Sequence, residues 1–247
     1  MIAAVAALAI GGTVAYFSDT ETSAGNTFTA GTLDLSIDLD GTWRNPWTGS
    51  FFNEIDMKPG DQVEKTISLH VDNDAWLCYK ITPTAEDDNY CNEPEIAAGD
   101  TTCDLLGGGE LQANSQILIW SDQGLVDGWQ CSKEEGPACN DDPQEGDNKY
   151  QHSTECGGEC EPIIYKGLVS NLPTGWVQGD LTKSQTEYIG IKFCVGAVGI
   201  TGSETGTVVT CDGSEVDNII QSDSWIADVT FLAEQKKNNP VFTCPPQ

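Results

Sequence analysis

The chain of 247 residues is poor in basic side chains. It has 11 lysines and arginines against 39 aspartates and glutamates, which gives a net charge of −28 and a pI near 4.1. Proteins that bind nucleic acids or dock on anionic membranes need clustered Lys and Arg. We therefore expect no nucleic-acid partner. Such an excess of carboxylates suits a protein that lives in salt or divalent cations, or in an assembly whose charges are bridged by ions.

Residues for common catalytic sites are also scarce. The chain has two histidines, His70 and His152, no HExxH motif for zinc and no GxSxG motif for a nucleophilic serine. His70 alternates with Leu69 and Val71, which places it on the solvent face of a predicted strand. His152 lies in an acidic loop. We expect no catalytic residues and a protein that is not an enzyme.

No apolar run is long enough to span a membrane as a helix. The N-terminal run covers residues 2–14 (IAAVAALAIGGTV), whereas a spanning helix needs about 20 apolar residues. It ends in small residues, as the apolar part of a signal peptide does, although no basic segment precedes it. We expect residues 1–15 to be signal-peptide-like. They are either removed near Ala15 or retained and buried against a neighbouring subunit, and no stable membrane insertion is expected after processing.

Ten cysteines are present, but no CxxC pair of the kind that binds zinc. An even number in a chain of this size favours disulfides and a secreted protein, extracellular or at the cell surface. The alternatives are free thiols or a metal-binding knuckle of His152, Cys156 and Cys160. The spacing gives no connectivity, although Cys244 is expected to pin the polar C-terminal tail. The candidate disulfide cysteines are Cys78, Cys91, Cys103, Cys131, Cys139, Cys156, Cys160, Cys194, Cys211 and Cys244.

Alternation of apolar and polar residues is the main secondary-structure pattern. Ile67, Leu69 and Val71 show it, and no stretch of ten or more residues has a helical stripe. Turn-forming residues separate the strand-like runs. The pattern predicts one all-β domain over residues 32–247, an antiparallel β-sandwich or jelly roll. Strands are expected at residues 27–38, 63–71, 76–81, 116–120, 163–168, 188–198, 205–210 and 225–232.

Two segments interrupt this rhythm. Residues 123–161 contain four cysteines, many carboxylates and almost no aliphatic side chains. Such a segment cannot bury enough apolar area to offset the chain entropy of folding. We therefore expect a surface insertion braced by disulfides. Residues 85–104 are expected to form a second, shorter one.

Several segments, taken in order, resemble the TasA/camelysin family of exported filament-forming proteins, whose precursors carry an unusual signal peptide. The most specific match covers residues 12–22 (GTVAYFSDTET) and continues through residues 26–35 (NTFTAGTLDL). The acidic, cysteine-rich insertions depart from the best-known members. Weaker matches are residues 57–61 (MKPGD) with the strand-like 63–72, residues 188–194 (YIGIKFC) and residues 228–239 (DVTFLAEQKKNN).

The resemblance implies a jelly roll and, as in several members, polymerisation by donor-strand complementation, in which the N-terminal segment of one subunit completes a sheet of the next. An unpaired sheet edge favours such pairing, and the extended residues 16–31 can supply the strand. A head-to-tail contact of this kind does not close, so it grows into a fibre. The alternative is an exposed leader or a first strand of the same domain. The expected donor residues, directed at another copy of this chain, are Tyr16, Phe17, Ser18, Thr20, Thr22 and Phe28.

Calcium is the candidate ion, because hard cations take carboxylate oxygens and the chain is rich in them. Asp38 and Asp40 have the spacing of part of a calcium loop but lack its bidentate Glu at the twelfth position. Acidic residues are also common in turns that bind no ion, so solvated turns are the alternative. The candidate ligands are Asp19, Glu21, Asp38, Asp40, Asp72 and Asp74, with Asp141 and Asp142 as a further pair.

Together these observations predict a structural subunit of an extracellular filament, pilus or biofilm-matrix fibre. The alternative is a surface protein that does not polymerise, either a camelysin-like peptidase or an adhesin that binds carbohydrate through Trp43 and Trp47. The aromatic residues at 43–52 are more often found in a core or an interface than in a sugar site.

Overall fold

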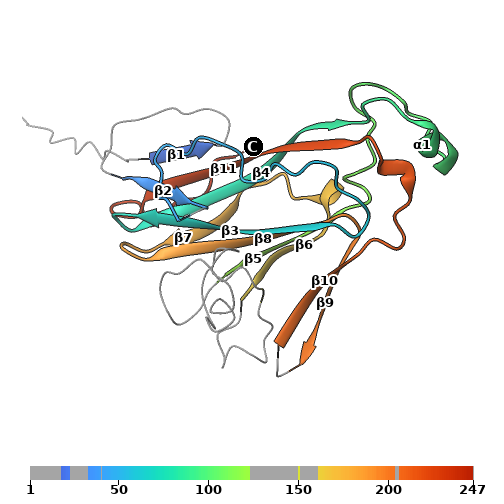
Figure 1. The fold of residues 1–247 in the computed structure, drawn as a ribbon. Coiled ribbons are helices and arrows are strands. Elements are labelled where there is room, and N and C mark those ends of the chain that lie inside the picture. The colour runs from blue at the N-terminus through green and yellow to red at the C-terminus, as the bar shows by residue number, and fades with distance from the viewer. Residues whose placement is uncertain are drawn as a thin grey trace, which may run out of the picture.

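The computed structural model describes residues 18–22, 33–39, 41–122, 150, 161–203 and 206–246. Almost all regular structure in these residues is β-strand (Figure 1). The described residues contain no helix that is both long and apolar enough to cross a membrane. The strands are β1 (Ser18–Thr22), β2 (Leu35–Asp38), β3 (Gln62–Val71), β4 (Ala75–Asp87), β5 (Gln116–Ser121), β6 (Ile163–Leu168), β7 (Val177–Leu181), β8 (Thr186–Cys194), β9 (Ala197–Ser203), β10 (Gly206–Asp212) and β11 (Ser224–Gln235). The helices are α1 (Glu93–Ala98) and the 3₁₀ turns η2 (Val169–Asn171) and η3 (Asn218–Ile220).

Two antiparallel sheets pack face to face. The first has the strand order β1-β11-β4-β7 and the second β2-β3-β8-β5-β6. The chain crosses repeatedly between them, since β4, β7 and β11 lie in the first sheet whereas β3, β5, β6 and β8 lie in the second. With β2 set aside, this is the strand order of a jelly roll. The predicted antiparallel sandwich is therefore confirmed.

The main core lies between the two sheets and is built from alternate strand residues. Ile67, Leu69 and Val71 of β3 are fully buried and face Leu77 and Phe231 of the first sheet. The alternation that predicted a strand at residues 63–71 therefore also identifies the residues of β3 that face the core.

A smaller apolar cluster lies on the outer face of the second sheet, beside the hairpin of β9 and β10. Leu118, Trp120 and Cys194 have no exposed surface there. A Cβ atom at Gly190 would lie 2.0 Å from Cε2 of Trp120. Glycine at this position is therefore what allows the indole to lie against β8.

The strand expected at residues 188–198 is wrong, because it is two strands, β8 and β9, that are separated by a turn at Gly196. Gly196 has φ of +130°, and a Cβ atom there would lie 2.2 Å from the carbonyl oxygen of Asp212. The strand expected at residues 76–81 is too short, because β4 runs on to Asp87 beside β11. Residues 85–87 therefore belong to the sandwich. Neither β7 nor α1 was expected.

The rest of the shorter insertion is braced as expected. The Cys91–Cys103 disulfide closes it across a sequence separation of 12. Helix α1 begins with a capping box, in which the Asn92 side chain accepts from the Glu95 N–H and the Glu95 carboxylate accepts from the Asn92 N–H. The longer expected insertion, residues 123–161, lies outside the described residues except for Tyr150 and Glu161.

Three disulfides join the described cysteines: Cys78–Cys244, Cys91–Cys103 and Cys194–Cys211. The first confirms that Cys244 pins the tail. Beside it the Trp76 indole N–H donates to the carbonyl oxygen of Asn239 at 2.9 Å. The tail is thus held along the outer face of β4. The other candidate cysteines, Cys131, Cys139, Cys156 and Cys160, lie outside the described residues.

Candidate functional site

The first and the last strand of the described residues, β1 and β11, pair at an edge of the first sheet (Figure 1). β1 is antiparallel to β11, with Thr20 opposite Leu232 and Thr22 opposite Thr230. Since β1 ends the sheet, it has a strand neighbour on one side alone among the described residues. Ser18, Thr20 and Thr22, which the sequence nominated as donor residues, lie in this strand. The other nominated donors, Tyr16, Phe17 and Phe28, lie outside the described residues.

β11 is longer than the strand that covers it. β1 pairs with residues 230–234, whereas β11 spans Ser224–Gln235. In the described part of the chain no strand pairs with residues 224–229 on the side of β1. An edge with unpaired backbone groups is a place where a strand from another chain can add.

The edge that β1 covers belongs to the core. Phe231 is 1% exposed and Ala233 is fully buried, and Phe231 lies within 6.1 Å, ring centre to ring centre, of both Phe51 and Tyr79. Loss of β1 with no replacement would open the backbone beside these side chains to solvent. The edge therefore needs a strand, from its own chain or from a neighbour.

The acidic residues nominated as calcium ligands are dispersed. Asp19 and Glu21 are in β1, in register with Ala233 and Phe231. Asp38 ends β2, where its Oδ1 accepts a hydrogen bond from the Thr42 N–H at 2.8 Å.

The remaining nominated carboxylates lie in a turn or outside the described residues. Asp74 lies in the exposed turn between β3 and β4, and its Oδ1 accepts from the Lys183 N–H at 2.7 Å. Asp72 is exposed in the same turn, and Asp40 lies outside the described residues. Within the described chain, the groups of three potential metal ligands lie elsewhere.

The aromatic residues at 43–52 are divided between core and surface. Trp47 and Phe51 stack at 5.1 Å and are 5% and 4% exposed. The core interpretation is confirmed for these two, which removes Trp47 from any sugar-binding face. Trp43 is 45% exposed, and its ring centre lies 5.6 Å from that of half-buried His70.

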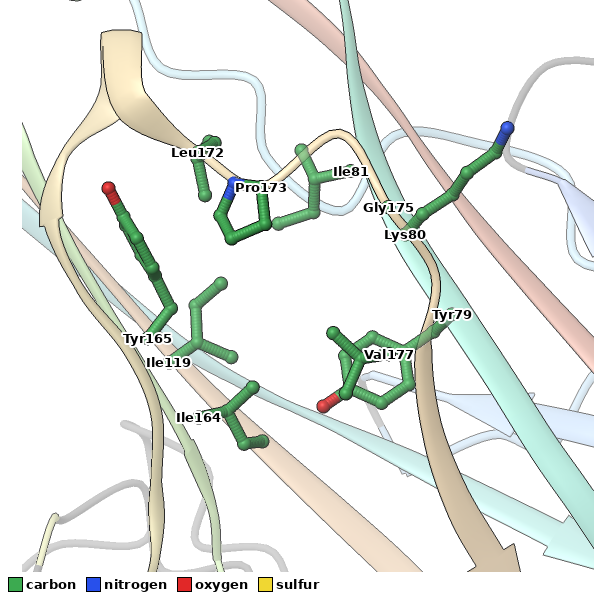
Figure 2. Close-up of a pocket in the computed structure, with 10 residues that line it drawn as sticks. All are labelled: Tyr79, Lys80, Ile81, Ile119, Ile164, Tyr165, Leu172, Pro173, Gly175 and Val177. Carbon is green, nitrogen blue, oxygen red and sulfur yellow. The ribbon is translucent and has the colours of Figure 1, made fainter. Parts of the chain in front are cut away.

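An apolar groove opens between β4 and β7 of the first sheet and β5 and β6 of the second (Figure 2). The Lys80 side chain points away from the opening, and the Tyr165 hydroxyl donates to the carbonyl oxygen of Leu168 at 2.7 Å. The described walls of the groove are mostly apolar, so it can bind apolar groups. Its lining residues are Tyr79, Lys80, Ile81, Ile119, Ile164, Tyr165, Leu172, Pro173, Gly175 and Val177.

Buried carboxylates gather at the end of the β4–β11 ribbon that lies away from β1. We call residues 88–111 and 218–223, which include α1, the acidic lobe (Figure 1). Asp88 and Glu95 have no exposed surface, and their carboxylate oxygens and one of Asp223 lie within 4.8 Å of one another. Sequence reasoning missed this group. The available signal was the density of acidic residues at 85–104, but Asp223 is far away in the sequence.

Burial disfavours the charged forms of three carboxylates of the lobe, Asp88, Glu110 and Asp223. It raises the pKa of Asp223 to about 7, although Oδ2 of Asp223 accepts from the N–H groups of Glu110 and Leu111 at 2.5 and 2.8 Å. Burial, followed by the charge of Asp100, raises the pKa of both Asp88 and Glu110. The lobe's own hydrogen bonds thus do not offset the cost of holding these charges together.

The fold and its edge define a class of protein: a disulfide-braced jelly roll whose N-terminal strand ends a sheet. Residues 1–81, about a third of the chain, match the family model described as camelysin metallo-endopeptidase. The match includes residues 12–35, which carry the most specific part of the resemblance, so the resemblance to the TasA/camelysin family is confirmed over this part of the chain. No curated protein matches the chain.

Proposed function

We propose that this protein is the structural subunit of an extracellular filament, in which β1 of one subunit pairs with β11 of the next. The observation that carries the proposal is the position of β1 at a sheet edge, paired with the last strand of the chain. The match of residues 1–81 to the camelysin family model also supports it. The sequence resembles the filament-forming members of the TasA/camelysin family over part of the same region.

The physical basis is the equivalence of two pairings. A strand from a neighbour can make the same backbone hydrogen bonds to β11 that β1 makes within its own chain. β1 has the sequence SDTET, without a large apolar side chain, so its pairing depends mainly on backbone hydrogen bonds. The exchange therefore costs little in the folded subunit, while residues 224–229 of β11 give an incoming segment further edge to pair with.

Such exchange produces a fibre. The donor strand and the acceptor edge are different surfaces, so each subunit donates to one neighbour and accepts from another. The three disulfides fit an oxidising compartment. We accordingly place the filament outside the cell, secreted or at the cell surface, with residues 1–15 acting as its export signal.

Electron microscopy of the purified full chain tests the proposal. We expect long regular fibres from the wild type and dispersed particles from Thr20→Pro, because proline at the centre of the five-residue β1 fixes φ away from the extended-strand value and cannot donate a backbone hydrogen bond to a neighbouring strand. Thr20→Val is the matched control, since valine suits a strand and should leave fibres intact. Circular dichroism must show both variants folded. Fibres from folded Thr20→Pro would contradict strand exchange through β1.

The family description also names a metallo-endopeptidase. A casein-cleavage assay with and without a chelator tests this second candidate. Cleavage that is lost on chelation and unchanged in Thr20→Pro would establish a peptidase that works without polymerisation. We expect no cleavage, because the chain has only two histidines and no HExxH motif.

A further inference from the structure

The acidic lobe brings together five carboxylates from separate segments. Asp88 follows β4, Glu95 lies in α1, Asp100 follows α1, Glu110 precedes β5 and Asp223 directly precedes β11. Asp88 and Glu95 are fully buried and Asp100 is 5% exposed. Each of Asp88, Glu110 and Asp223 is close enough to other members to feel their charge. Five carboxylates gathered at one partly buried place need compensation, either by protonation or by a cation.

Two of the most deeply buried carboxylates face a sulfur atom that cannot donate a proton. Oδ2 of Asp100 lies 2.9 Å from Sγ of Cys91, and the carboxylate oxygens of Asp88 lie 3.8 and 3.9 Å from the same sulfur. Because Cys91 is bonded to Cys103, its sulfur carries no hydrogen. Among the residues that the structure describes, Oδ2 of Asp100 therefore has no donor, and Asp88 accepts a backbone hydrogen bond from Asp104.

Two further oxygens of the cluster are buried and have no donor among the described residues. They are Oε2 of Glu110 and Oδ1 of Asp223. By contrast, Oδ2 of Asp223 accepts two backbone N–H groups, and Glu95 accepts from Asn92 and from the N–H and hydroxyl of Ser222. Some carboxylate oxygens of the lobe thus accept hydrogen bonds, whereas others are buried with no hydrogen-bond donor among the described residues.

In the described part of the chain, no basic side chain forms an ion pair with the cluster. The sequence has no Lys, Arg or His from residue 81 to 132, or from residue 193 to 235. The ion pairs of the described residues involve Lys58, Lys65, Lys192 and Lys236, none of them paired with a residue of the lobe.

The geometry points to a calcium ion bound by Asp88, Glu95 and Asp223. The carboxylates of Asp100 and Glu110 are close enough to add their charge. Two oxygens bound to the same calcium ion at about 2.4 Å are at most about 4.8 Å apart, which matches the grouping of Asp88, Glu95 and Asp223 within 4.8 Å. An all-oxygen ligand set is the one that calcium prefers. Zinc is disfavoured, because the nearby cysteines are held in a disulfide and no histidine lies in these segments.

The local structure holds the ligands in place before the ion binds. The capping box fixes Glu95, and Thr102 donates from its N–H and its hydroxyl to Oδ1 of Asp100 at 2.8 and 3.1 Å. The Cys91–Cys103 disulfide closes the loop that carries Glu95 and Asp100. An ion at this place ties together the end of β4, helix α1 and the start of β11, so calcium should stabilise the whole end of the sandwich.

Calorimetric titration of the chelator-stripped full chain with Ca²⁺ tests the site. The buffer contains Mg²⁺ and moderate salt, which suppress weak binding to the acidic surface. We expect one tight site per chain and a calcium-dependent rise in melting temperature. Asp88→Asn and Asp223→Asn should each weaken binding roughly 10- to 100-fold. Asp72→Asn, which removes an exposed carboxylate in the β3–β4 turn, should bind like the wild type.

Two controls separate calcium binding from effects on folding and on polymerisation. In chelator, Asp223→Asn should melt at or above the wild-type temperature, because it removes repulsion in the empty cluster. The Thr20→Pro chain should keep the tight site, so failure of the filament proposal leaves this one standing. Absence of a saturable tight site in the wild type would overturn the inference. So would wild-type affinity in both folded asparagine variants.

Discussion

Thr22 of the first strand stands directly opposite Thr230 of the last. Residues opposite each other in antiparallel strands have Cα atoms about 4.5–5.5 Å apart, which is within the range that a disulfide bridges. The same opposition arises within one chain when β1 folds back, and between two chains when β1 is donated. This pair of residues can therefore report which chain supplies the strand.

Gly190→Ala should destabilise the fold. A Cβ atom at residue 190 would lie 2.0 Å from the Trp120 ring, and Trp120 is fully buried, so neither can move without disturbing the second sheet. We expect a loss of about 1–3 kcal/mol or more in the free energy of unfolding, measured by denaturant titration. Gly179→Ala is the matched control, since its Cβ would be 3.7 Å from Leu77 Cδ2. An equal loss in both variants would contradict the packing argument.

The Cys78–Cys244 disulfide should contribute more stability than Cys91–Cys103. Their sequence separations are 166 and 12, and a longer closed loop restricts the unfolded chain more. We expect removal of the first pair, as a double alanine variant, to cost about 5 kcal/mol and removal of the second about 3 kcal/mol. Denaturant unfolding of both variants measures the difference. A smaller cost for the first pair would show that tail pinning is not a main source of stability.

Alkaline pH should unfold the protein as buried Tyr79 ionises. Burial, and after it the charge of Glu187, raises the pKa of Tyr79 above its usual value of 10.0. Because the folded-state pKa is the higher one, the stabilising effect is fully present below about pH 10 and is lost as pH rises through the folded-state pKa. The test is a titration to alkaline pH in which unfolding and tyrosinate absorbance are measured on the same sample. Tyr79→Phe should shift unfolding to higher pH, whereas the same change at Tyr90, which is 59% exposed, should not.

Much of the sandwich was predictable from local pattern. The alternation in residues 63–71 places Ile67, Leu69 and Val71 on the core side of β3, because a half-buried strand needs a period of two. The break between β8 and β9 was not predictable in this way. It depends on contact of Gly196 with the backbone of Asp212. Strand β7 was not predicted, because an edge strand such as VQGDL needs little apolar alternation.

The residues of one candidate site were predictable from the sequence, and those of the other were not. Ser18, Thr20 and Thr22 were predicted because they lie in one contiguous motif, within an N-terminal segment that is expected to be extended. The acidic lobe was not found, because Asp88 and Asp223 meet only through the pairing of β4 with β11. Acidic pairs close in sequence, such as Asp72 and Asp74, attracted attention instead, although the described contact of the Asp74 carboxylate is with a backbone N–H.

The most direct test of strand exchange uses two single variants, Thr22→Cys and Thr230→Cys, which are mixed before assembly and oxidised in the fibre. Strand exchange predicts a covalent link between one chain of each kind, seen as a band of twice the subunit mass by non-reducing electrophoresis. Each variant assembled alone is the control and should give no such band. The double variant, oxidised as a monomer, should close within one chain and form no fibres. Fibres from the mixture without the linked band, or fibres from the oxidised double variant, would contradict donation of β1.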